Sequence, residues 1–193
     1  MKKIISIITI LSSLIAINNA QAQAQENKYL IEPNHTSVVW VADHLGFSKS
    51  LGKFNNIEGH IIFDEKNPQN SSTEITIKTK GIVTGIEKFD DHLKGKDFFD
   101  IKNFPVAKFV SNKINVIAKN KAKITGDLTI LGITKSITLD VVFNKSAINP
   151  FNQKPTIGFS ATANINRSDF NIKYALPNVA DNVKLIIEVE ANR

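Results

Sequence analysis

Apolar and polar residues alternate along most of the chain, which is the pattern of β-strands with one buried and one exposed face. The clear runs are residues 36–44, 57–63, 75–79, 107–118, 124–130, 136–143, 157–165 and 183–189, with a short further run at 29–31. Helical spacing of apolar residues is confined to residues 86–94. Strands with one wet face are typical of antiparallel sheets, so we expect an all-β fold with little helix.

A sheet of this size removes its exposed edges by closing into a barrel or by forming a sandwich. The chain has no linker, internal repeat or low-complexity stretch, which predicts one domain over residues 27–193. Small residues lie on apolar strand faces at Gly59, Gly126, Ala161 and Ala163. They would leave room for a ligand inside an eight-stranded barrel, or only relieve crowding at tight bends, and spacing alone does not decide.

The first residues have the features of a secretory signal peptide. Lys2 and Lys3 precede an apolar run over residues 4–17, and the small residues at 20–22 fit a cleavage site. The apolar run is shorter than the roughly 20 residues that span a bilayer, and no later segment is long enough. We therefore predict a signal peptide over residues 1–22, with cleavage as late as residue 24, and export to a periplasm.

The amino-acid composition excludes several kinds of site and partner. The chain has no cysteine, which excludes disulfides, thiolate metal sites and a cysteine nucleophile, and fits a bacterial periplasm. The formal charge is +6, and loss of Lys2 and Lys3 leaves about +4 on the mature chain. The lysines are scattered rather than clustered with aromatic residues, so we predict no nucleic-acid partner. An anionic lipid headgroup is the less favoured explanation for the basic charge.

Histidines and acidic residues are the main candidates for catalysis or metal binding. The four histidines, which lack the short spacing of a zinc enzyme, are His35, His44, His60 and His92. Asp90-Asp91-His92 and the nearby residues 97–100 could serve acid–base chemistry, but no nucleophile motif accompanies them. We favour helix capping and packing for these groups. The sequence thus predicts no catalytic residue, no metal and no cofactor.

Two further features bear on a binding site. Phe98 and Phe99 stand in a polar stretch, where exposure would be costly, so we expect them to close one end of the core or line a pocket mouth. On a strand, Arg167 and Asp169 would share one face. They would then pair with each other, or Arg167 would face an anionic group of a ligand.

These landmarks, taken in order, resemble the YceI-like family over nearly the whole mature chain. The matching segments are Glu32-Pro33-Asn34-His35-Thr36, Gly52 with Phe54 and Gly59, Asp90 to Leu93 with Asp97 to Asp100, Pro105 with Phe109 and Ser111, Gly126 to Lys135, and Arg167 to Phe170. The chain departs from the family pattern at Glu32, Thr36, Asn171 and Ala180. Asn tolerates a positive φ, whereas Ala at position 180 would be strained if that position required one.

The resemblance implies an eight-stranded antiparallel lipocalin-like barrel with one or two short helices, which holds a polyisoprenoid chain in its cavity. The residues predicted to line the cavity are Trp40, Phe63, Phe98, Phe99, Phe109, Leu128, Phe143 and Phe159. The residues predicted to meet a polar headgroup at the mouth are His44, Asp91, His92 and Arg167.

Three functions are compatible with these features. The favoured one is a periplasmic binding protein that transports or stores an isoprenoid quinone or prenyl phosphate. The alternatives are a structural or stress protein with a packed barrel, and an enzyme that uses histidine and aspartate. We predict no transmembrane segment, and a transient contact with a membrane surface and a homodimer both stay open.

Overall fold

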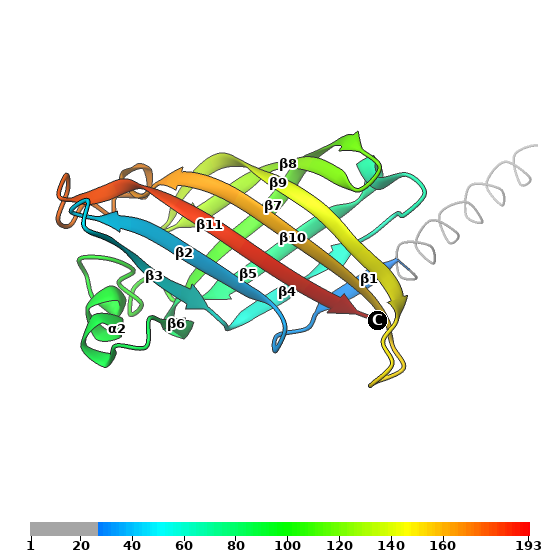
Figure 1. Ribbon diagram of the computed structural model, residues 1–193, viewed down its shortest axis with the longest axis horizontal. Coiled ribbons are helices and arrows are strands. Elements are labelled where there is room, and N and C mark those ends of the chain that lie inside the picture. Colours follow the sequence, from blue (N-terminus) through cyan, green and yellow to red (C-terminus); the bar gives the residue numbers. More distant parts are fainter. Residues whose placement is uncertain (1–26) are drawn as a thin grey trace, which may run out of the picture.

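A computed structural model describes residues 27–193, which form a closed antiparallel β-barrel with one α-helix (Figure 1). The predicted eight-stranded barrel is confirmed. The predicted signal peptide, with both of its cleavage points, lies outside the described residues. Within residues 27–193, no helix is long and apolar enough to cross a membrane.

The helix, α2 (Glu87–Lys94), lies where the helical spacing predicts it. Short 3₁₀ turns are η1 (Pro68–Asn70), η2 (Thr79–Gly81) and η3 (Arg167–Phe170). The strands are β1 (Lys28–Ile31), β2 (Ser37–His44), β3 (Ser48–Phe54), β4 (Ile57–Ile62), β5 (Ser72–Lys78), β6 (Ile82–Val83), β7 (Val106–Ala118), β8 (Lys121–Ile130), β9 (Ile133–Ile148), β10 (Pro155–Asn166) and β11 (Val179–Asn192).

These strands fill eight positions around the barrel because three positions each contain two consecutive short strands. Strands β1 and β2 follow one another along the same edge of β11. On their other side, β1 pairs with β4 and β2 pairs with β3. In the third position, β5 pairs with β4 and β6 pairs with β3. The pairing of β1 with β11 closes the ring.

The register of β8 against β9 shows how the alternating pattern becomes an inside and an outside. Ile124 lies opposite Leu139, and both belong to the apolar interior. The next position places Thr125 opposite Thr138, whose hydroxyl groups hydrogen-bond at 3.0 Å on the exposed face. Cross-strand pairs of this kind fix the register, because a shift by one residue would exchange the two faces.

The two ends of the barrel differ. At one end lie helix α2, the turn between β2 and β3, and the connection between η3 and β11 (Figure 1). At the opposite end lie the hairpin between β9 and β10 and the last residues of β11. Strand β11 runs from the first end, where Val179 pairs with His44, to the second end, where Asn192 pairs with Leu30. We call the first the helix end and the second the hairpin end.

Candidate functional site

A cavity of about 730 Å³ occupies the helix end of the barrel. This volume lies in the range of about 300–1,000 Å³ that is typical of small-molecule sites. Most of the wall is apolar and comes from β2, β3, β7, β8, β10, β11 and α2. Exposed residues such as His44 and Lys49 also line the cavity, so it reaches the surface at this end. The barrel is therefore not filled, which argues against the packed-barrel alternative.

Four of the eight predicted cavity residues line this space: Trp40, Phe98, Phe99 and Leu128. Trp40 and Leu128 point inward from β2 and β8, as the alternation of each strand requires. Phe98 and Phe99 follow helix α2 and reach the cavity from the segment that leads to β7. Both rings are half-buried, and they line the cavity.

The other four predicted residues, Phe63, Phe109, Phe143 and Phe159, do not line the cavity. Phe63, Phe143 and Phe159 also lie inside the barrel, but nearer the hairpin end, where Phe159 pairs with Val189 of β11. Their ring centroids are 5.3–5.4 Å apart, so they fill the interior with one aromatic cluster. These three rings form a floor beneath the cavity rather than part of its wall.

Phe109 is buried on β7, and its ring occupies the space that Gly126 leaves on β8. A Cβ atom at Gly126 would lie 2.5 Å from Cζ of Phe109 and would also meet the carbonyl oxygen of Val110. Gly59 allows a similar approach, because a Cβ there would collide with the carbonyl oxygen of Glu74. These two glycines therefore relieve crowding, which was one of the two alternatives left open by the sequence.

The small residues that open the cavity are instead Ala42 on β2 and Ala107 on β7, both of which line it. Ala161 and Ala163 are buried but lie outside its lining. The alternation of β2 places Ala42 on the same face as Val38 and Trp40, so the sequence pattern could have identified Ala42 as an inward-facing small residue. Phe89 of helix α2 also lines the cavity and was not predicted.

The polar mouth residues come from three separate segments. His44 ends β2, and His92 lies on α2, where its Nε2 is 3.2 Å from Oδ2 of Asp97. The His92 ring also meets the rings of Phe98 and Tyr174 edge-on, with centroids 5.1 and 4.8 Å away. Both histidines line the cavity, whereas Asp91 is exposed and does not. Lys49 of β3, which was not predicted, lines the mouth beside them.

Asp90 has a structural role at the start of helix α2. Its Oδ1 accepts hydrogen bonds from the backbone N–H and the hydroxyl of Thr84, at 2.7 and 2.6 Å. The side-chain hydrogen bond from Thr84 lowers the pKa of Asp90 below its ordinary value, and the backbone bond adds to this. This arrangement holds the segment before the helix, but it is not the predicted helix cap, because no side chain caps the first turn of α2.

The geometry of Arg167 corrects the sequence prediction. Residues 167–170 form the 3₁₀ turn η3 rather than a strand, so Arg167 and Asp169 do not share a strand face. The buried guanidinium donates to four backbone carbonyl oxygens. These bonds run from Nε to Ala180 (2.9 Å), from Nη1 to Ile172 (3.1 Å) and Tyr174 (2.8 Å), and from Nη2 to Val179 (2.9 Å). Arg167 touches the cavity, but most of its donors hold the chain between η3 and β11 in place.

Asp181 fixes the same region through Ser168. Its two carboxylate oxygens accept hydrogen bonds from the backbone N–H and the hydroxyl of Ser168, at 2.8 and 2.6 Å. The hydroxyl bond lowers the pKa of Asp181, with further lowering from the backbone bond and the nearby charge of Arg167. Asn171 has the positive φ that its sequence position predicts (64°), whereas Ala180 has none and is not strained.

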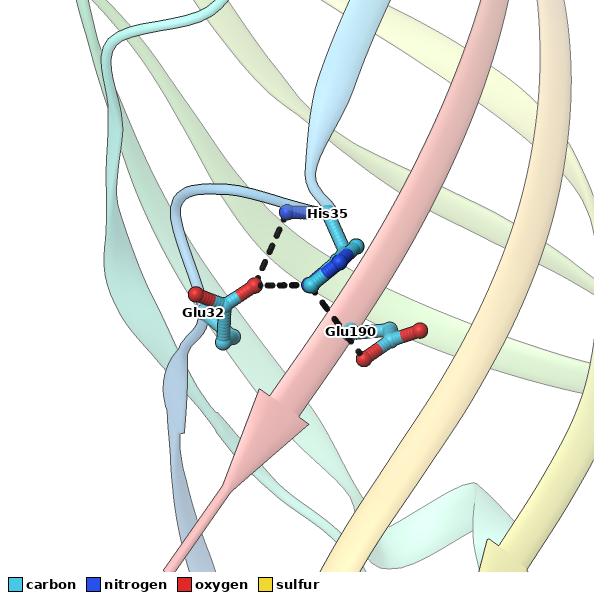
Figure 2. A group of neighbouring side chains, drawn as sticks. All are labelled: Glu32, His35 and Glu190. Carbon is cyan, nitrogen blue, oxygen red and sulfur yellow. Dashed lines mark hydrogen bonds and ion pairs between the residues drawn. The ribbon is translucent and has the colours of Figure 1, made fainter. Parts of the chain in front are cut away.

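A second group of titratable side chains lies away from the cavity, at the corner between β1 and β2 (Figure 2). Glu32 Oε2 lies 2.7 Å from Nδ1 of His35, and that nitrogen lies 3.9 Å from Oε2 of Glu190 on β11. Within residues 27–193 this is the one cluster of three metal-ligand side chains whose donor atoms come close together.

Local hydrogen bonds account for this arrangement. The carboxylate of Glu32 accepts from the backbone N–H groups of Asn34 and His35, at 3.2 and 2.8 Å, and thereby closes the turn. Although partial burial acts to raise the pKa of Glu32, the hydrogen bonds from His35 and Asn34 lower it overall. Thr36 then ties the corner to β11 through Glu190, whose carbonyl oxygen accepts from the Thr36 hydroxyl at 3.1 Å. These residues belong to a turn that is attached to the barrel wall. Among residues 27–193 they form no cluster with His44, His60 or His92.

Comparison with known proteins agrees with this architecture. The model of the YceI-like domain matches residues 29–191. A UPF0312 protein of Pseudomonas putida (strain W619) is 35% identical over 157 residues, which cover 81% of each chain. Crystalline BcnA of Burkholderia cenocepacia superposes with a TM-score of 0.76 at 27% identity, covering 83% of this chain and 99% of that one.

A more distant structure shows the same fold. It is a polyisoprenoid binding domain from Saccharophagus degradans, implicated in plant cell wall breakdown, with a TM-score of 0.67. It is 12% identical and covers 85% of this chain and 97% of that domain. From the match of the family model over residues 29–191 and the relatives at 35% identity, we conclude that this chain belongs to the YceI-like family.

Proposed function

We propose that this protein binds the apolar chain of a polyisoprenoid lipid inside the barrel, with the polar end of the lipid at the mouth. The observation that carries the proposal is the cavity of about 730 Å³, whose apolar wall opens beside His44, Lys49 and His92. Burial of each CH₂ group contributes about 0.8 kcal/mol, so a prenyl chain needs few polar contacts to bind tightly. The family and the fold resemble those of binding proteins, which supports this proposal over an enzyme.

The mouth suits a lipid with a small polar or anionic end. The side chains of His44 and Lys49 form no hydrogen bond or ion pair with the other residues in 27–193, so both are available to a headgroup. Lys49 would favour a phosphate, and either histidine would favour a quinone carbonyl or a phosphate. The predicted signal peptide supports a periplasmic location, where such a protein would transport or store its lipid between membranes.

The single tryptophan of the chain, Trp40, lines the cavity and provides a direct measurement of binding. Quinones quench tryptophan fluorescence at short range, so an isoprenoid quinone that enters the cavity should quench Trp40 in a saturable manner. Native mass spectrometry of the gently purified protein should also show a bound lipid. A single lipid-free mass, together with no saturable quenching by isoprenoid quinones or displacement by prenyl phosphates, would overturn the proposal.

Two variants that fill the cavity test whether the lipid binds there. Ala42→Phe and Ala107→Phe put a ring into the space that the prenyl chain would occupy, so each should weaken quinone binding by roughly tenfold or more. The matched control is Ala147→Phe, the same change at an exposed position of β9. Unchanged quinone affinity in both cavity variants, at melting temperatures near that of the wild type, would place the lipid elsewhere.

A further inference from the structure

Exposed apolar side chains gather around the mouth of the cavity. Those of 49–90% exposure at the helix end are Leu45 and Phe47 in the turn between β2 and β3, Leu51 on β3, Ile86 before α2, and Tyr174 in the segment before β11. We call these five residues the mouth rim. Leu51, Ile86 and Tyr174 also line the cavity, so the rim is continuous with the cavity wall.

The turn between β2 and β3 gives the rim its most exposed part. Phe47 is 90% exposed, and no contact within the barrel accounts for an aromatic residue at this place. Leu45 adopts a φ of 59°, followed by Gly46 at 74°, and the N–H of Phe47 donates to the carbonyl of His44. Such a turn favours Asn or Gly at its first central position, and a leucine there costs free energy.

The side chain of this leucine is half exposed, so packing within the fold offsets only part of the cost. A residue with an unfavourable backbone conformation and an exposed apolar side chain indicates a role in binding rather than in folding. The turn is nonetheless held firmly, since Gly46 N–H donates to Oδ1 of Asp43 at 2.8 Å and Leu45 N–H donates to the carbonyl of Asn178. The two apolar side chains are thus presented on a rigid support.

We propose that the mouth rim docks on the surface of a lipid bilayer, with Leu45 and Phe47 inserted among the acyl chains, so that cargo passes between membrane and cavity without crossing water. The inference rests on the proposed function, because a polyisoprenoid resides in membranes and its transfer through water costs about 0.8 kcal/mol per CH₂. An opening bordered by apolar side chains and placed against the bilayer removes that cost.

Charge around the rim indicates what kind of binding to expect. Lys49 and Lys173 lie within two residues of rim residues along the chain, but so do Asp43 and Glu87. Because both signs are present, we expect insertion of apolar side chains to dominate. Binding should therefore persist in about 1 M salt, where charges more than about 3 Å apart are screened.

Vesicle flotation tests the docking directly. Full-length mature protein is mixed with vesicles of phosphatidylcholine and phosphatidylglycerol, and the bound fraction is measured. Phe47→Ser should lower the partition coefficient by roughly tenfold. Leu45→Asn should lower it as well while leaving the fold as stable or more stable, since Asn suits the positive φ. The matched control is Phe151→Ser, because Phe151 is 96% exposed in the hairpin between β9 and β10 at the opposite end.

Quenching of Trp40 separates docking from lipid binding. With a quinone delivered in detergent, Phe47→Ser should bind as the wild type does, whereas its uptake of quinone from vesicles should be slowed by roughly tenfold. Equal flotation and equal uptake for Phe47→Ser, Phe151→Ser and the wild type would overturn the docking proposal and leave lipid binding intact. Vesicle binding without quenching in detergent would instead count against the proposed function alone. A wild-type dimer that Phe47→Ser dissociates, with vesicle binding unchanged, would assign the rim to a second copy of the chain and overturn docking.

Discussion

The indole of Trp40 on β2 meets the phenyl ring of Phe89 on helix α2 edge-on, with ring centroids 6.2 Å apart and planes at 80°. This contact joins the barrel wall to the helix beside the cavity, since both residues line it. The Nε1–H of Trp40 is buried and has no hydrogen-bond acceptor among the described residues. The indole is thus held by packing, and Phe89 joins the buried Leu93 in packing the helix against the barrel core.

Phe89→Ala should therefore loosen helix α2 more than the barrel. Loss of a partly buried aromatic ring should cost about 2 kcal/mol of unfolding free energy, less than a fully buried ring would. Amide hydrogen exchange should accelerate in residues 84–94, while the amides of β10 change only in step with global stability. Uniform acceleration along the chain would show that the helix and the barrel open as one unit.

Arg167→Lys should destabilise the protein although it keeps the charge. The guanidinium bonds to four carbonyl groups at once, and an ammonium group cannot reproduce this geometry. We expect a loss of about 3 kcal/mol in urea unfolding, because buried carbonyl groups are left without donors. At temperatures where the variant stays folded, its affinity for an isoprenoid quinone should change little. A large loss of quinone affinity at unchanged stability would instead assign Arg167 to the headgroup.

The case of Arg167 shows where sequence patterns stop being informative. Alternation correctly predicts an antiparallel all-β fold, and the resemblance to the YceI-like family correctly adds the closed barrel. The spacing of Ile86, Phe89 and Leu93 correctly predicts helix α2. The acceptors of Arg167, however, lie 5 to 13 residues further along the chain, and their positions depend on how that segment folds back. No periodic pattern encodes such a contact.

The aromatic residues of the barrel illustrate a second limit. Alternation indicates that Phe143 and Phe159 face inward, and they do. It does not indicate their height along the barrel axis, which depends on strand tilt and stagger. Trp40 and Leu128 consequently line the cavity, whereas Phe143 and Phe159 pack into the floor beneath it.

Gly126→Ala should destabilise the barrel because the added methyl group would meet the carbonyl of Val110 and the ring of Phe109. We expect a loss of about 2 kcal/mol or more in unfolding free energy. Gly158→Ala on β10 is the matched control, since the nearest atoms to its Cβ would lie 3.9 Å away. That change should be close to neutral. Phe109→Leu in the Gly126→Ala background should restore only part of the loss, because the Val110 carbonyl remains in place.

Asp181 should contribute to stability in a pH-dependent manner. Its hydrogen bonds with Ser168 lower the pKa in the folded protein below the unfolded value of about 3.9. A carboxyl with a lowered folded pKa stabilises the protein above the unfolded pKa, and this contribution is lost as the pH falls through the folded pKa. Asp181→Asn should thus be less stable than the wild type at pH 7, by about 1–2 kcal/mol, and the difference should shrink below about pH 4.

Urea unfolding at a series of pH values measures this difference. Asp91→Asn is the matched control, because it removes the same charge from an exposed side chain that makes no hydrogen bond within residues 27–193. The other carboxyl groups with lowered pKa values, Glu32, Asp64 and Asp90, act equally in wild type and variant, so they cancel in the comparison. The difference in unfolding free energy between Asp181→Asn and the wild type could instead stay constant from pH 7 to below pH 4. That result would mean that Asp181 stabilises η3 through the geometry of its hydrogen bonds and not through its charge.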